Sequence, residues 1–97
     1  MKNFQEKLDE YRRSIDRLDT ILIYTLGERF KQTELIGRLK AEAKIQASDH
    51  GRESAQIEKL RKLSADANID ADFTEKILTL IISEVKKKHE EIRSNRY

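Results

Sequence analysis

The feature that most constrains this chain is an apolar pattern of helical period that runs without a breaker from about Asn3 to about Ala43. Its apolar or near-apolar positions, three or four residues apart, are Leu8, Tyr11, Ile15, Leu18, Leu22 and Leu26. This spacing predicts one long helix, with Asn3 as its cap and Glu6 three residues later. Gly27 and Gly37 would each cost about 1 kcal/mol relative to Ala. A helix broken at either glycine and folded back into a monomeric bundle is the alternative.

The length of this helix predicts a partner. Forty helical residues span ~60 Å, whereas a compact monomer of 97 residues has a diameter of only ~30–35 Å. The middle of the helix is apolar on nearly every side, at Leu18, Ile21, Leu22, Ile23, Tyr24 and Leu26. A helix that is apolar all round must be buried all round, and two shorter helices cannot surround it. We therefore expect a second copy of the chain to cover it.

Two shorter helices are predicted after a loop at residues 44–48. The first begins near residue 48 or 49, ends near residue 66, and has apolar positions at Ile57, Leu60 and Leu63. The second begins at Asp70 or Asp72, where Asp72 and Glu75 would form a capping pair, and ends near residue 93. Its expected inward face is Phe73, Ile77, Ile81 and Val85. The chain therefore reads as one all-α domain over residues 1–97, with one long and two shorter helices.

Composition narrows the class of protein. Cysteine is absent and the two histidines are not at metal-ligand spacing, so neither a metal nor another cofactor is expected. The longest uncharged stretch, Thr20–Gly27, is far shorter than the ~20 residues of a membrane span. The charged N-terminus lacks a signal core, so a cytoplasmic protein is expected. The 20 basic and 18 acidic residues are interleaved, which argues against a nucleic-acid partner.

The apolar stripe of the long helix becomes cationic after Leu26, at Arg29 and Lys40. These two residues are eleven apart, which places them ~16 Å apart along the axis and within about 20° of the same direction. Burying such charges unpaired is costly. Either carboxylates of the protein or a small anionic ligand must therefore neutralise them, and the pair alone leaves both options open.

Other charged residues extend this group. Asp49, Arg52 and Glu53 fall at the start of the second helix, where the acidic residues suit the helix dipole. Alternatively, Glu53 accepts a hydrogen bond from a ligand hydroxyl and Arg52 supports an anion. Arg12 lies ~25 Å before Arg29 on the same helix, too far to reach the same small molecule. In an antiparallel pair of long helices, however, Arg12 of one copy would approach Arg29 of the other.

The chain resembles the all-helical class of chorismate mutase. The matching pieces occur in the family's order and spacing: Tyr11–Asp19, Leu26–Phe30, Ile36–Lys40 and Asp49-x-x-Arg52-Glu53. The resemblance extends from about Leu8 to about His89. It implies three helices per subunit in an intertwined homodimer, with two sites that each borrow an arginine from the partner. The implied activity is the pericyclic rearrangement of chorismate to prephenate in the shikimate pathway of aromatic amino acid biosynthesis.

The resemblance also implies roles for individual residues. The partner subunit's Arg12 and this chain's Arg29 would hold the two carboxylates of chorismate. Lys40 would donate to the ether oxygen of the breaking C–O bond and to a carboxylate. Asp49 and Glu53 would bind the ring hydroxyl.

Three further positions complete the implied site. Arg52 would support its anionic end. The family usually has Ser one turn before Gln near the end of the third helix, but here these places are Val85 and His89. Val85 therefore removes one carboxylate hydrogen bond. His89 stands where Gln, sometimes Glu, donates to the ether oxygen; imidazole has one N–H for this task and imidazolium has two. Lys40, Arg29 and His89 are the expected catalytic residues.

Several alternatives remain at this point. One alternative reads His89 as a surface histidine, and His50 is expected as an exposed loop residue without a role. On the same scaffold, an enzyme that eliminates pyruvate from isochorismate would use a similar cationic pocket. A regulatory helical dimer without catalysis is a third reading, because Val85 and His89 depart from the family pattern. A nucleic-acid-binding protein is the weakest option.

Overall fold

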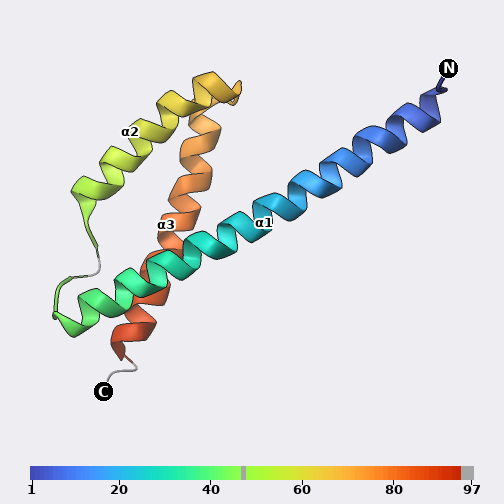
Figure 1. The fold of residues 1–97 in the computed structure, drawn as a ribbon. Helices are drawn as coiled ribbons and strands as arrows, with labels where there is room; N and C mark the ends of the chain where they lie inside the picture. The colour runs from blue at the N-terminus through green and yellow to red at the C-terminus, as the bar shows by residue number, and fades with distance from the viewer. Residues whose placement is uncertain (47, 95–97) are drawn as a thin grey trace. The chain divides into compact units, whose positions relative to one another are not determined.

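The computed structural model describes residues 1–46 and 48–94. Three helices follow one another: α1 at Phe4–Glu42, α2 at His50–Ala67 and α3 at Ala71–Ser94 (Figure 1). Their ends lie within two residues of the predicted limits. These residues contain no strand, so the predicted all-α class is confirmed. The chain divides into two compact units, residues 1–32 and the residues from 33 onward, and the boundary falls inside α1.

Helix α1 is continuous through Gly27 and Gly37, so the alternative of a helix broken at either glycine is wrong. Asn3 caps its N-terminus as predicted, because Glu6 N donates to Asn3 Oδ1 at 2.8 Å. The helix ends at a turn in which Lys44 adopts a left-handed φ of 58°. Local hydrogen bonds thus fix both ends of α1.

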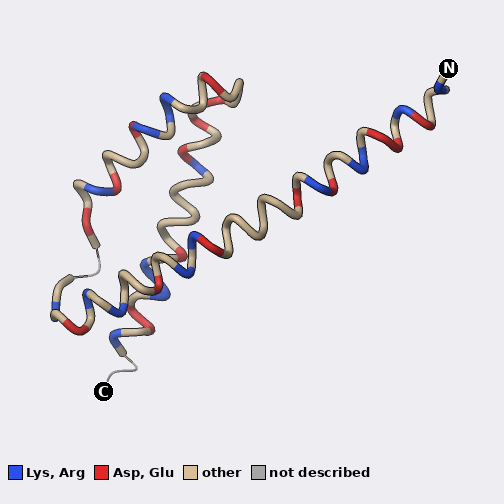
Figure 2. Tube along the Cα trace, viewed as in Figure 1, with Lys and Arg blue, Asp and Glu red and all other residues tan. Residues whose placement is uncertain are grey.

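The middle of α1, in the first unit, presents an apolar surface. Figure 2 shows interleaved charges along α1, with an uncharged stretch between them that corresponds to Thr20–Gly27. Leu22 is 62% exposed and Tyr24 is 75% exposed. Other large apolar side chains exposed along this part of α1 are Tyr11, Ile15, Leu18, Ile21 and Ile23. No helix in the described residues is long and apolar enough to cross a membrane.

In the second unit, α2 and α3 form an antiparallel hairpin (Figure 1). Asn68 closes α2 in the left-handed region, with φ 57°, and Ile69 N donates to Ser64 O at 2.9 Å. Asp70 then caps α3, because Phe73 N donates to Asp70 Oδ2 at 3.0 Å. Left-handed Asn at a helix end and Asp at a helix start are residue types that favour such a tight reversal.

The capping pair predicted at Asp72 and Glu75 is wrong. Asp70 is the cap, and Asp72 and Glu75 instead reach across the hairpin to Arg61 of α2, each with an oxygen 3.0 Å from Nη1. The hydrogen bond with Asp72, followed by the contribution of Glu75, raises the pKa of Arg61 above its usual value. These contacts link the two helices near their turn.

The inward face predicted for α3 is wrong at two positions. Phe73 is 55% exposed and Ile77 is 42% exposed, whereas Leu78 is buried. The reason is the rotation of α3 against α2: the hydroxyl of Thr74 bonds that of buried Ser64, 2.7 Å away. Because this contact turns the Thr74–Leu78 side of α3 inward, Phe73 and Ile77 fall outside the chain's own core.

Candidate active site

The candidate residues occur in both units. Arg12 and Arg29 belong to the first unit. The six in the second unit lie at the end of α1, around the start of α2 and near the end of α3: Lys40, Asp49, Arg52, Glu53, Val85 and His89. The structure describes how several of these six are brought together.

His89 is buried, with 5% of its surface exposed, so the alternative of a surface histidine is wrong. Its Nε2 lies 2.7 Å from the carbonyl oxygen of Thr33. The ring lies directly on Gly37, where a Cβ would come within 2.8 Å of Nε2. Glycine at position 37 therefore allows the imidazole to approach the backbone of α1.

This contact places the end of α3 against the face of α1 that carries Lys40. Thr33, Gly37 and Lys40 are separated by four and three residues, so they share one helix face. Lys40 is half-buried on that face. Since His89 contacts the backbone at Thr33 and Gly37, Lys40 follows about one turn further along the same surface.

A second contact joins α3 to the first turn of α2. Lys86 Nζ lies 3.0 Å from Glu53 Oε1. His50 Nδ1 lies 3.7 Å from the other oxygen, Oε2. The Glu53 side chain is only 20% exposed, and the Lys86 ammonium group holds its carboxylate in place. The segment 85–89 of α3 is thus linked to both α1 and α2.

Sequence reasoning missed Lys86. The signal was the run Lys86–Lys88, but the run does not indicate which lysine faces α2. His50 was expected in a loop without a role; it is exposed, but it is the first residue of α2 and lies close to Glu53. That expectation is therefore wrong about the element.

Asp49 and Arg52 occupy the places expected from a capped helix. Asp49 is the N-cap of α2, and its Oδ1 accepts a hydrogen bond from Arg52 N at 3.0 Å. The side chain of Arg52 is exposed and that of Val85 is half-buried. The cap fixes the first turn of α2, which carries Glu53.

The two candidate arginines of the first unit differ in exposure. Arg12 is exposed, whereas Arg29 is half-buried. Within the residues that the structure describes, the buried Nη1 atom of Arg29 has no hydrogen-bond partner. A buried guanidinium nitrogen without a partner is costly. Among the described residues, no carboxylate of the protein satisfies this atom.

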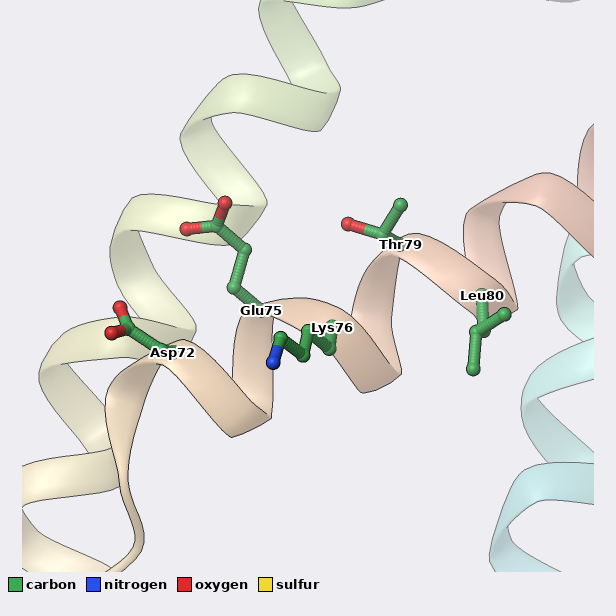
Figure 3. Close-up of a pocket in the computed structure, with 5 residues that line it drawn as sticks. All are labelled: Asp72, Glu75, Lys76, Thr79 and Leu80. Atoms are coloured by element: carbon green, nitrogen blue, oxygen red, sulfur yellow. The ribbon is translucent and has the colours of Figure 1, made fainter.

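A pocket on the N-terminal half of α3 is a poor candidate for an anion. Figure 3 shows its lining residues, which are Asp72, Glu75, Lys76, Thr79 and Leu80. Two of these are carboxylates, both bound by Arg61. The pocket therefore does not suit a dicarboxylate, and it includes none of the predicted site residues.

The fold is a small all-α protein of three helices. Near the end of α3, His89 and Lys86 contact α1 and α2 and form a polar site. The chorismate mutase type II family model matches residues 11–90, and the chain belongs to this family. The chain is also 30% identical over 81 residues to a chorismate mutase of Methanocaldococcus jannaschii, an alignment that covers 84% of this chain and 82% of that protein. These matches confirm the predicted family, and the matched range contains all eight predicted site residues.

Proposed function

We propose that this protein is a chorismate mutase that converts chorismate to prephenate in the cytoplasmic synthesis of aromatic amino acids. The observation that carries the proposal is the family match over residues 11–90. The geometry supports it, because His89 and Lys86 of α3 contact the Lys40-bearing face of α1 and the first turn of α2.

The reaction requires orientation and electrostatics. One C–O bond of the enolpyruvyl ether breaks while a C–C bond forms, with no nucleophile and no net proton transfer. The enzyme must hold the flexible arm over the ring in the reactive conformer. It must also place hydrogen-bond donors at the ether oxygen, which becomes more negative in the transition state.

The proposed site divides these tasks. Arg29 and the partner subunit's Arg12 bind the two carboxylates and fold the arm. Lys40 donates to the ether oxygen and to a carboxylate, with His89 assisting it. The buried Nη1 atom of Arg29 lacks a protein partner among the described residues, which supports the assignment of Arg29 to an anionic substrate.

The hydroxyl end of the substrate falls to the start of α2. The carboxylates of Glu53 and Asp49 bind the ring hydroxyl as hydrogen-bond acceptors, and Arg52 supports the anionic end of the site. Lys86, 3.0 Å from one Glu53 oxygen, orders that carboxylate. Val85 offers an apolar contact where the family usually supplies a serine hydroxyl.

A homodimer is part of the proposal. The exposed apolar residues of α1, such as Leu22 and Tyr24, are the surface that a second copy would cover. Arg12 is exposed on the same helix. An antiparallel partner would bring its own Arg12 to this chain's site, so each site would need both subunits.

Mixing two inactive variants tests the shared site. Arg12→Ala and Arg29→Ala homodimers should each lose chorismate turnover, followed by ultraviolet absorbance with product identification. In the heterodimer, one site receives both mutations and the other receives neither, so about half of the activity should return. A purified heterodimer that recovers nothing would contradict the arrangement.

The same assay separates the alternatives. Release of pyruvate from isochorismate, without turnover of chorismate, would instead establish the lyase. A folded dimer that transforms neither substrate would favour the regulatory role.

A further inference from the structure

We infer that Thr33 and Gly37 fix the tautomer of His89, so that this ring donates a hydrogen bond to the ligand only as imidazolium and only through Nδ1. The inference rests on the proposed function. Its starting point is the 2.7 Å contact between His89 Nε2 and Thr33 O. A carbonyl oxygen can only accept, so Nε2 must carry the hydrogen. A neutral imidazole has a single N–H, and this contact uses it.

The remaining nitrogen is the one that can meet a ligand. Nδ1 of His89 is buried and has no hydrogen-bond partner among residues 1–46 and 48–94. Buried polar atoms without a partner are rare in folded proteins and call for an explanation. In the neutral ring, Nδ1 is an acceptor with a lone pair; in imidazolium, it is a donor.

Gly37 is a positioning residue for this arrangement. A Cβ at position 37 would come within 2.8 Å of Nε2, so any larger residue displaces the ring from Thr33. Glycine is less favourable than alanine inside a helix. The close approach of His89 gives a physical reason for a glycine at this otherwise unfavourable position.

The charge state of the ring then decides whether it helps or hinders. The ether oxygen and the carboxylates of chorismate are all acceptors, so a lone pair on Nδ1 would face them unfavourably. Imidazolium offers them N–H instead. A bound dicarboxylate adds negative charge and therefore favours the protonated ring.

The surrounding charged groups are mostly cationic. On α1, Lys40 shares the face of Thr33 and Gly37. From α2, the Glu53 carboxylate is held by Lys86 of α3. Glu90 and Arg93 of α3 flank His89 and pair with each other at 3.9 Å. Substrate binding would thus add the negative charge of two carboxylates near His89.

The first test is a pH profile of kcat/KM with chorismate. Wild-type kcat/KM should fall about tenfold per pH unit once the His89 ring is neutral. His89→Gln, whose amide N–H does not titrate, should be flat over the same range. His50→Gln should keep the descending limb and so assign it to His89.

The second test does not depend on activity. Side-chain ¹⁵N–¹H correlation spectra of the free protein, recorded on the alkaline side where the ring is neutral, identify the neutral tautomer. The protein has two histidines, and the His50→Gln variant assigns the remaining signals to His89. Nε2–H is expected in the wild type, and Gly37→Ala should weaken that preference by displacing the ring.

The outcomes are distinguishable. An Nδ1–H tautomer, or a flat profile in an active wild-type enzyme, would overturn this inference and leave the proposed function standing. A wild type that fails to turn over chorismate at any pH would overturn the proposed function, and this inference with it. If Gly37→Ala fails to fold, the wild-type spectrum and the His89→Gln profile still decide.

Discussion

The two units of this chain treat their apolar and polar residues in opposite ways. In the first, the large apolar side chains in the middle of α1 are exposed, and Leu22 and Tyr24 are examples. In the second, specific polar contacts join helices: Ser64 to Thr74, Lys86 to Glu53, and His89 to the backbone of α1. The second unit brings side chains of different helices into contact, whereas the first leaves its large apolar side chains exposed.

This difference indicates where the free energy of each region comes from. Burial of apolar area contributes about 25 cal/mol per Å², so the exposed residues of α1 represent stabilisation that one chain does not obtain alone. The contacts named in the second unit are instead individual hydrogen bonds and an ion pair, each of which involves only a few atoms. Three substitutions test the contributions of the two units to assembly and activity, and they follow in order of decreasing expected effect.

The largest effect is expected from Leu22→Asp. A carboxylate placed in the proposed dimer interface must be desolvated without a partner, so the dimer should dissociate and kcat/KM should fall by more than ~100-fold, since each proposed site needs two subunits. Sedimentation equilibrium and the chorismate assay measure this. Leu22→Met, which conserves volume and apolar character, should remain dimeric and active. If the Leu22→Asp protein still sedimented with the mass of a dimer, this surface would not be the dimer interface.

Lys40→Ala should affect chemistry without affecting assembly. Loss of one preorganised donor to developing negative charge costs about 10²–10³ in rate, so kcat should fall by at least ~100-fold while circular dichroism and mass remain unchanged. Lys59→Ala, on the exposed surface of α2, is the matched control. Near-normal turnover by Lys40→Ala would exclude this lysine from the mechanism.

Lys86→Met should produce the smallest change. Partly exposed ion pairs contribute about 0.2–1 kcal/mol, so loss of order at Glu53 should raise KM roughly 2–5-fold, with a smaller effect on kcat. Steady-state kinetics on chorismate measures the split. Lys87→Met, the next residue in the run and an exposed one, should leave KM unchanged. A lower melting temperature with unaltered KM would instead mean that the Lys86–Glu53 pair serves the fold alone.

Local features of the sequence predicted the helices well. The caps at Asn3 and Asp49 depend on a side chain and an amide three residues later, so the sequence contains the whole interaction. The family pattern likewise identified His89 as a candidate site residue. The prediction of Asp72 and Glu75 as a capping pair was wrong because two acceptors close to the same helix start competed, and Asp70 bound the amide.

Interactions between helices were harder to predict. The run at residues 86–88 offers three lysines of similar chemistry, and only the rotation of α3 against α2 selects Lys86 for Glu53. The same rotation buries Leu78 and exposes Phe73 and Ile77. A helical period states which residues share a face, but it does not state which face meets a given neighbour.

The sequence by itself determined the number of helices, their limits to within two residues, the caps at Asn3 and Asp49, and the family to which the chain belongs, because these depend on spacing along one segment. The tertiary structure decided that Gly37 lies under the ring of His89 and that Thr33 binds one of its nitrogens. His89 follows Gly37 by 52 positions and Thr33 by 56. Only the packing of two rigid helices sets such a contact, and with it the nitrogen that remains for a ligand.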